Sequence, residues 1–543
     1  MMLVLTTRPM IDTTAVHVDI PAEFVRLRQD PQTTYIRLGP LTMQETTELA
    51  CQRLGGATLP TEAAQLIWQQ SEGHPFFSQE IVYTMRETGM VEVKHRQVRL
   101  VDTVQRFNDL GFSSTIQGVI NSRIDRLPPG PRLALKVASV IGRTFSLNLL
   151  KNIFPVANDR AALADYLALL IDLDIVTELP ETLGTYRFEH IITQEVSYQL
   201  LPFAQRQRLH RAVAEWLEQT YVFDLASYYP LLAYHWERTL GDNLDHTVAL
   251  STINYMEKAG EKSLQEGSYR EAIGYFKQAM AFAERMRALA VAESDLLPSY
   301  LSDVRRARWL VRVADAHHGL GQSASTRQCC HEALTLLGES FPAERPRLMS
   351  GLTQLSTEHA WRMMRPAAVR QIEPEDERQT IDKAHAYNLL TQIYFLSNQP
   401  FEAAYAALSG FRLVVQLKPT AELSELYAMM YGVLKRLRLS RVAESYTEQA
   451  QAIANELNHQ PALAFSLLMA ALFKFGDAPW SEIQSLVNRS IKVSDDIGDK
   501  RRLGDGLSAL GYVLLFRGEY IQGIGNGLRL YESGVSSDNV EHQ

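Results

Sequence analysis

Few residues in this chain have the types and spacing that chemistry requires, and phosphate binding is the first chemistry to consider. The 543 residues hold no Gly-x-x-x-x-Gly-Lys-Ser/Thr loop and no Gly-Lys dipeptide. A nucleoside triphosphatase needs such a loop, because its backbone amides and lysine hold the β- and γ-phosphates. Gly523, Gly525 and Gly527 follow a predicted helix rather than a strand, which favours a flexible repeat end over a dinucleotide-binding loop. We therefore expect no autonomous ATP hydrolysis.

Motifs for metal binding and nucleophilic catalysis are equally sparse. Neither His-Glu-x-x-His nor a paired Cys-x-x-Cys occurs, so the sequence predicts no metal site and no catalytic residue. The segment 321–325 lacks the second glycine of a nucleophile elbow and lies in a predicted helical repeat. His317 and His318 lie on a predicted repeat helix, where we expect packed or solvated histidines.

Composition indicates a globular protein of several domains. The length predicts three or four folding units, at roughly 100–200 residues per domain. A net charge of −8 argues against nucleic acid as the main partner, because binding to a phosphate backbone requires a basic surface. The three cysteines, Cys51, Cys329 and Cys330, cannot form a disulfide framework. No apolar run is long enough to cross a membrane and no secretory signal is recognisable, so we predict a cytoplasmic location.

The elements that would have to position functional groups begin with an apolar run. Met1–Pro9 predicts a strand buried on both faces of a parallel sheet. No later segment supplies a comparable set of alternating strands and helices. We therefore expect the partner strands to lie outside this chain, which would make it a truncated, C-terminal part of a larger protein.

Residues 40–110 predict a small helical domain. Thr42 and Glu45 have the spacing of a capping box, and Gly55 and Gly56 end the first helix. Two further helices are expected after Pro60, the first to about Gln70 and the second over residues 76–85, with a turn at residues 71–75 between them.

Residues 111–205 predict helices over 116–126, 132–141 and 161–171, and then a hairpin of strands 175–179 and 186–188. We interpret this segment as a winged helix that acts as a structural spacer, because the region carries little clustered positive charge; DNA binding is the alternative.

Beyond residue 206 the sequence repeats. Residues 256–279 have the small and aromatic residues of a tetratricopeptide helical hairpin, and residues 507–520 reproduce its first half. A 40-residue spacing relates Ala403, Ala443, Ile483 and Gly523. Because such hairpins must stack to bury their apolar faces, we predict a mainly α fold that ends in an α-solenoid. A solenoid of this kind favours an interaction scaffold, with a protein partner or effector on the repeats.

Five segments resemble a known family in their order and spacing: Thr6–Pro9, Leu41–Glu45, Ser71–Glu80, Arg187–Tyr198 and Arg206–Ala214. They are similar to the C-terminal part of large bacterial signal-transduction ATPases (STAND/AAA type) with helical-repeat tails. In that family the ATPase often follows a class III adenylate or guanylate cyclase domain, as in soluble adenylyl cyclase, or a protein kinase or transcription-activator domain. The resemblance covers about residues 1–290 and the remainder only as a repeat type.

The resemblance implies roles for four residues. Arg8 matches a sensor arginine that faces the γ-phosphate, and Gly73 and Pro75 match a lid turn whose proline packs on adenine. His190 is similar to a histidine that contacts the β-phosphate of ADP and locks the closed state. The family's cofactor is ATP or ADP, but without a P-loop we expect this chain to bind neither tightly. The alternative interpretations are a strand-end cap for Arg8, a helix-start proline for Pro75 and a core histidine for His190.

The resemblance and the repeats together give a functional hypothesis. The predicted domains are a remnant of the ATPase core sheet (1–39), a helical lid (40–110), a winged helix (111–205) and tetratricopeptide-like repeats (206–543). We expect a non-catalytic sensory and regulatory part of a signalling ATPase that is associated with a cyclase or kinase output domain. The alternatives are a free-standing helical-repeat adaptor and a winged-helix transcription regulator.

Overall fold

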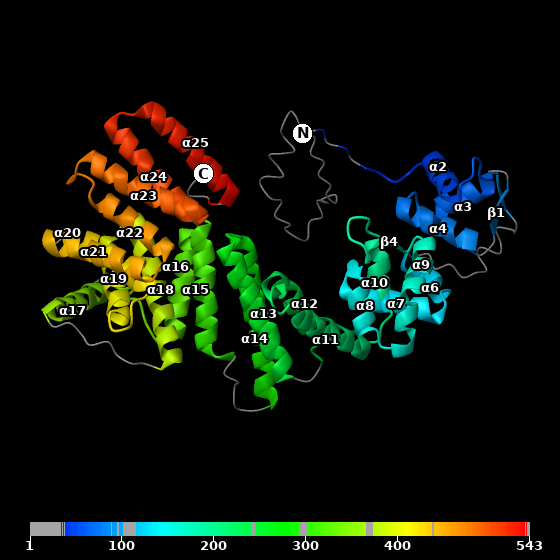
Figure 1. Cartoon of the computed structure of the whole chain (residues 1–543), viewed down its shortest axis with the longest axis horizontal. Coiled ribbons are helices and arrows are strands. Elements are labelled where there is room, and N and C mark those ends of the chain that lie inside the picture. Colours follow the sequence, from blue (N-terminus) through cyan, green and yellow to red (C-terminus); the bar gives the residue numbers. More distant parts are fainter. Residues whose placement is uncertain are drawn as a thin grey trace. The chain divides into compact units, whose positions relative to one another are not determined.

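The computed structural model describes residues 34, 36, 38–87, 90–94, 97–100, 116–241, 245–293, 301–364, 373–436, 439–537 and 539 (Figure 1). The predicted strand at Met1–Pro9 lies outside the described residues, and so does Arg8. The chain divides into two compact units. Unit 1 contains residues 1–144 and 158–200, and unit 2 contains residues 145–157 and 201–543.

Unit 1 begins with three short helices: α2 (Met43–Leu54), α3 (Thr61–Ser71) and α4 (Pro75–Glu87). The predicted capping box is confirmed, because the Glu45 N–H donates to Thr42 Oγ1 at 3.3 Å and the Thr42 N–H donates to Glu45 Oε2 at 2.8 Å. Gly55 ends α2 with φ +69°, as the glycine pair predicted. The apolar faces of these helices form one core.

A β-hairpin that the sequence interpretation did not predict follows these helices. Strands β1 (Val91–Lys94) and β2 (Gln97–Leu100) pair antiparallel, with Val91 opposite Leu100. The Val98 N–H donates to the Thr58 carbonyl at 3.1 Å, so the hairpin attaches to the loop between α2 and α3. Four alternating residues per strand are too few to separate a strand from a short helix by periodicity alone.

The rest of unit 1 combines helices with a small sheet. The helices are α6 (Ile116–Asp125), α7 (Pro129–Ile141), α9 (Leu163–Asp172) and α10 (Ile191–Gln199), and a 3-10 turn, η1 (Ala157–Ala162), precedes α9. The predicted hairpin is present as β4 (Val176–Glu178) and β5 (Thr185–Phe188), with Thr177 opposite Arg187. A third strand, β3 (Thr144–Ser146), gives the order β3-β5-β4. The winged-helix interpretation of this segment stays a prediction.

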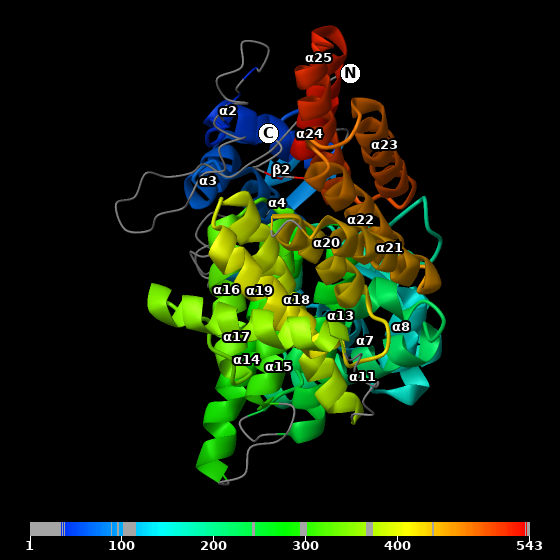
Figure 2. The ribbon, with the colours of Figure 1, turned by 90° about the vertical axis from the view of Figure 1, so that its left-hand side faces the viewer.

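Apart from residues 145 and 146 of β3, the regular elements in the described part of unit 2 are all helices. It begins with α8 (Leu147–Ile153), α11 (Phe203–Thr220), the 3-10 turn η2 (Leu225–Tyr228) and α12 (Tyr229–Glu237). The stacked helices follow as α13 (His246–Gln265), α14 (Tyr269–Glu293), α15 (Asp303–Gly319), α16 (Ser323–Leu336), α17 (Arg345–Met364), α18 (Pro374–Leu396), α19 (Pro400–Val414), α20 (Ala421–Arg436), α21 (Ser440–Glu456), α22 (Gln460–Phe473), α23 (Trp480–Asp496), α24 (Lys500–Arg517) and α25 (Tyr520–Ser537). Figures 1 and 2 show the last three hairpins stacked in sequence.

The repeat prediction is confirmed in its register. Ala403, Ala443, Ile483 and Gly523 are each the fourth residue of the second helix of a hairpin, in α19, α21, α23 and α25. Close helix approach depends on small residues, since a Cβ atom on Gly260 would lie 2.8 Å from the Phe276 ring. The fold is thus mainly α, with an array of tetratricopeptide-like hairpins.

One detail of the repeat prediction was wrong. Gly523, Gly525 and Gly527 lie inside α25 rather than in a flexible end. The interior of a helix tolerates glycine at a cost of about 1 kcal/mol each, and tertiary packing can override that cost. Here the Asn526 side chain donates to the Leu507 carbonyl of α24 at 2.7 Å and so anchors the glycine-rich turn.

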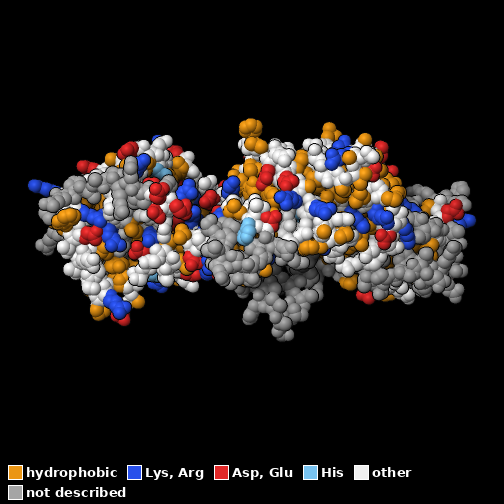
Figure 3. Space-filling model, turned by 90° about the horizontal axis from the view of Figure 1, so that it is seen from below, with side chains coloured by type: hydrophobic (Ala, Val, Ile, Leu, Met, Phe, Trp, Pro, Cys, Tyr) orange, Lys and Arg blue, Asp and Glu red, His pale blue; other side chains and the backbone are white. Residues whose placement is uncertain are grey.

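No helix within the described ranges combines the length and the apolar character needed to cross a bilayer. On the face drawn in Figure 3, acidic and basic side chains are interspersed rather than separated by sign.

Candidate functional site

The predicted lid turn joins α3 to α4 and contains Gly73. This residue has φ +72°, and its carbonyl accepts the Leu41 N–H at 2.7 Å. A Cβ atom at this position would lie 2.3 Å from the Leu41 carbonyl oxygen, so a larger residue would displace the backbone. Glycine is therefore required here by local geometry alone.

Pro75 and His190 lie close to this turn. Pro75 is the exposed first residue of α4, a position that suits proline because its missing N–H would have no helical partner. His190 directly precedes α10, and its ring centroid lies 4.1 Å from that of Phe76. The structure thus brings Gly73, Pro75 and His190 together around Phe76; we call these four residues the lid cluster.

The electrostatic surroundings of His190 favour a neutral ring. Burial lowers its pKa most, and Arg53, Arg123 and Arg143 lower it further, against an opposing effect of Glu189. A neutral imidazole still offers one N–H donor and one acceptor nitrogen. The lid cluster could therefore donate a hydrogen bond to an anion without first taking up a proton.

A buried ion pair beneath the lid cluster was not predicted. Both carboxylate oxygens of Glu80 in α4 lie 2.9 Å from Nη1 of Arg123 in α6, and both side chains are almost fully buried. Arg123 also donates to the Leu173 carbonyl and lies over the Tyr83 ring at 4.9 Å. Glu80 belongs to the segment Ser71–Glu80, which the sequence analysis identified. Its partner Arg123 lies 43 residues further along the chain, and no local spacing indicates that the two residues pair.

In the repeat array, charged side chains link the first helices of different hairpins, and we call this set the charged ladder. Its pairs are Glu257 of α13 with Arg305 of α15 at 2.5 Å, Arg308 of α15 with Asp382 of α18 at 3.0 Å, His385 of α18 with Asp315 of α15 at 2.7 Å, and Glu425 of α20 with Arg502 of α24. Buried charges of this kind are tolerated only when they are paired. The ladder therefore ties distant hairpins into one body.

His385 of the ladder and the buried histidine His318 have opposite protonation states. Burial lowers the pKa of His385, but Asp315 at 2.7 Å and Glu422 at 3.6 Å outweigh it and raise the pKa to about 10. Burial, with Arg501, lowers the pKa of His318 to about 3. Arg501 of α24 donates to His318 of α15 and to Gln392 of α18 at 3.2 Å. His385 is thus an imidazolium and His318 a neutral hydrogen-bond acceptor.

Two further buried histidines form a pair that joins α11 and α12. Nδ1 of His210 lies 2.8 Å from Nδ1 of His235, and both residues are fully buried. Burial lowers the pKa of each to about 3, and Arg238 adds to the effect. Both rings are therefore neutral at physiological pH, which fits a structural pair.

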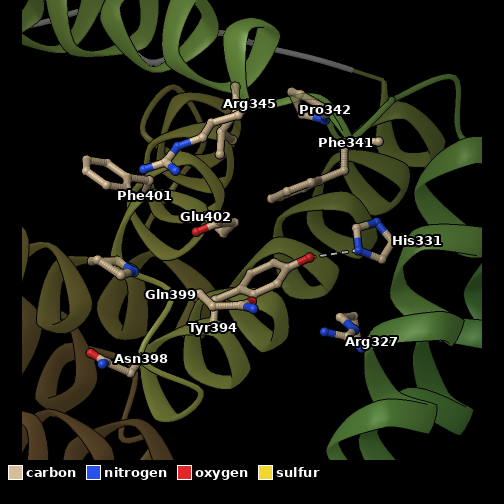
Figure 4. Close-up of a pocket in the computed structure, with 13 residues that line it drawn as sticks. Arg327, His331, Phe341, Pro342, Arg345, Tyr394, Asn398, Gln399, Phe401 and Glu402 are labelled. Carbon is tan, nitrogen blue, oxygen red and sulfur yellow. Dashed lines mark hydrogen bonds between the residues drawn. The ribbon is translucent and has the colours of Figure 1, made fainter.

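A pocket of about 710 Å³ opens between α16, the segment before α17 and the turn from α18 to α19 (Figure 4). Its walls carry two guanidinium groups, from Arg327 and Arg345, and the aromatic rings of Phe341, Tyr394 and Phe401. His331 Nε2 lies 2.9 Å from the Tyr394 hydroxyl. No sequence motif indicated this pocket, because its walls come from three separate segments.

The last hairpin exposes an apolar surface that we call the end face. Its side chains are 52% to 88% exposed and come from α24 and α25: Tyr512, Leu515, Ile521, Ile524, Leu528, Tyr531 and Val535. The α25 members recur at alternating steps of three and four residues, which places them on one side of the helix. Exposed apolar patches of this kind mark interaction sites.

Metal ligands do not cluster in the described residues: no three His, Cys, Asp or Glu side chains are arranged to hold an ion.

Comparisons with known proteins give two findings. A family model described as a domain of unknown function (DUF8739) matches residues 42–99, which span α2 to β2. Among solved structures, the chain is similar to a signal transduction ATPase with numerous domains (STAND) protein with a tetratricopeptide repeat sensor from Pyrococcus horikoshii. The identity is 10% and the TM-score 0.29, over 94% of this chain and 76% of that one. The search of curated proteins found no match.

Proposed function

We propose that this chain is a non-catalytic regulatory module whose helical repeats bind a protein partner. The observation that carries this proposal is the end face, because two of its positions, Ile524 and Leu528, are apolar where the preceding hairpins are polar. Ile524 and Leu528 of α25 correspond, 40 residues earlier, to Gln484 and Asn488 of α23. A further 40 residues earlier the same positions are Glu444 and Glu448 of α21.

The occupant that fits the end face is an amphipathic helix of the partner. In the preceding hairpins, the second helix packs against the first helix of the next hairpin, as α23 does against α24. Tyr531 of α25 corresponds to Ile491 of α23, whose side chain contacts α24 at Gly506. A partner helix with apolar residues at steps of three and four would continue this packing.

The test compares three purified baits: the unaltered chain, the end-face variant Ile524→Glu/Leu528→Glu, and the matched control Gln484→Glu/Asn488→Glu. Proteins retained from lysate of the source organism are identified by mass spectrometry, and the leading candidate is purified for titration. We expect the end-face variant to lose at least about tenfold in affinity, since a carboxylate would be buried against the helix. Equal affinity of all three baits would refute the proposal.

We further propose that unit 1 acts as a nucleotide-dependent switch of the kind found in signalling ATPases linked to nucleotide cyclases. Support comes from the lid cluster, where the exposed Pro75 ring could meet a base and neutral His190 could donate to a phosphate oxygen. Bound ADP or ATP would supply negative charge and a planar ring to these residues. Nucleotide would then favour one conformation of the lid over another, which is a population shift.

This second proposal is tested with ADP and a P-loop-containing fragment supplied in trans. We expect His190→Ala to weaken ADP binding by about tenfold, the usual value of a hydrogen bond to a charged group. The control is His74→Ala, because His74 is an exposed neighbour in the same turn. Unchanged ADP affinity in His190→Ala would remove His190 from the switch.

A further inference from the structure

The pocket between α16 and α19 has the charge of an anion site. Arg327 lies on α16 and Arg345 begins α17, so the two guanidinium groups enter from different elements. In the described part of the array neither forms an ion pair, and Arg345 instead lies over the Phe401 ring at 5.9 Å. Each guanidinium therefore keeps hydrogen-bond donors available to a ligand.

The remaining titratable groups of the pocket set its net charge. Glu402 is the one acid among the lining residues. Burial, with the charge of Arg327, lowers the pKa of His331, so this ring is neutral at pH 7. Burial raises the pKa of Tyr394 to about 12, so its hydroxyl keeps its proton. Two cations and one anion leave one positive charge, which matches a ligand with a single negative charge.

The walls of the pocket suit a flat apolar group. Phe341 lies 5.3 Å from Tyr394 between ring centroids, at 30° between ring planes. Phe401 faces the same space and is 44% exposed (Figure 4). Aromatic surfaces of this kind pack on planar rings. The volume of about 710 Å³ lies in the range of small-molecule sites, which is roughly 300–1,000 Å³.

Polar groups at the base of the pocket are in place to orient a ligand. The hydrogen bond between His331 and Tyr394 holds both rings in position. Asn398 and Gln399 contribute side-chain amides, and α19 begins here with Pro400. Pro400 has no N–H and the Ala403 N–H donates to the Gln399 carbonyl at 3.0 Å, so the first-turn amides of Phe401 and Glu402 are the further donors for an anion.

We propose that this pocket binds a small organic monoanion that carries a planar ring, such as an aromatic carboxylate. The carboxylate pairs with Arg327 beside the Tyr394 hydroxyl, and the ring packs between Phe341 and Phe401. Arg345 closes the site from above Phe401. This site is separate from the end face and from the lid cluster, so the inference goes beyond the proposed function.

The test is calorimetric titration of the full chain with 2-naphthoate. We expect saturable binding at millimolar concentration or below, and binding at least about tenfold weaker for the neutral analogue 2-naphthalenemethanol, because the charged hydrogen bonds are lost. Inorganic phosphate tests whether charge alone is sufficient, and we expect it to bind more weakly than 2-naphthoate. Absence of 2-naphthoate binding, or equal binding of the neutral analogue, would overturn the proposal.

Three variants assign the site to these residues. Arg327→Gln should weaken 2-naphthoate binding by about tenfold to a hundredfold, and Phe401→Ala should weaken it less. The matched control is Arg347→Gln, since Arg347 is an exposed arginine that pairs only loosely with Glu344 at 3.5 Å outside the pocket. Binding that is unchanged in Arg327→Gln, or equally reduced in Arg347→Gln, would contradict the assignment.

Discussion

The charged ladder and the end face of the repeat array have opposite relations between residue type and burial. In the ladder, Glu425 and Arg502 are largely buried although both are charged. In the end face, Ile521 and Ile524 are largely exposed although both are apolar. Each hairpin is covered by its neighbours, so burial in a solenoid depends on the hairpin next to a position as much as on the residue at that position. The ladder should therefore determine stability and the end face should determine binding.

The largest expected effect comes from breaking the ladder. Glu425→Ala removes the nearer carboxylate of the buried Arg502, which then keeps Asp499 at 3.4 Å, and it removes the acceptor of the Asn388 amide at 2.6 Å. We expect the free energy of unfolding to fall by about 3 kcal/mol. The control Glu344→Ala removes the exposed ion pair between Glu344 and Arg347 and should change the free energy of unfolding by about 0.5 kcal/mol or less. Urea unfolding followed by circular dichroism measures both, and equal midpoints would show that the ladder is not a stabilising feature.

Acid should weaken the array through histidines that are buried in the neutral form. The folded-state pKa of His318 is about 3, below its ordinary value of about 6.5. Between these values the unfolded chain binds a proton that the folded chain excludes, so this stability is lost as pH falls below about 6.5. At about pH 5 the loss is about 2 kcal/mol for His318, and His210 and His235 add to it. Urea titrations at several pH values measure how steeply the free energy of unfolding depends on pH. His318→Gln should make this dependence less steep. An unchanged dependence in this variant would show that His318 is not a source of the acid sensitivity.

Alkaline pH should also weaken the array, but through the loss of a proton from His385. Its folded-state pKa is raised to about 10, so its stabilising contribution is complete below about pH 6.5 and declines as pH rises towards 10. The decline is at most about 1.4 kcal/mol per pH unit. An NMR titration of the His385 ring should find it protonated at pH 8. A deprotonated ring at that pH would mean that Asp315 and Glu422 do not hold a cation between them.

The smallest expected effect on stability is at the end face. Tyr531→Glu places a charge on a surface that is already exposed, so the free energy of unfolding should change by about 0.5 kcal/mol or less. Its counterpart one repeat earlier, Ile491→Glu, puts a charge into the packed contact between α23 and α24 and should cost several kcal/mol. Comparable destabilisation by the two substitutions would mean that the end face is covered in the isolated chain and is not available to a partner.

Local signals in the sequence predicted much of the fold. The capping box at Thr42 and the glycine end at Gly55 are short-range interactions, so neighbouring residues suffice to identify them. The 40-residue register of Ala403 and its counterparts could be predicted because each hairpin packs in the same way and places a residue of similar type at the same position of its second helix. The hairpin β1–β2 was missed because its strands are too short for periodicity to indicate them.

The candidate sites depended on longer-range contacts. Gly73 and Pro75 could be selected from a motif, but their proximity to His190 depends on packing between segments more than 110 residues apart. The ladder has no local signal, since Arg502 pairs with Glu425 across 77 residues. The pocket is built from three segments, so no single motif contains it.

The amino-acid sequence by itself determined the helical hairpins, their period and the turn at residues 71–75, because hydrogen bonds and apolar spacing within about 40 residues decide them. Only the tertiary structure decided which charges are buried in pairs, which apolar side chains remain exposed on α25, and which histidines are charged. These properties depend on the dielectric surroundings and on partners that the folded chain brings together from distant positions.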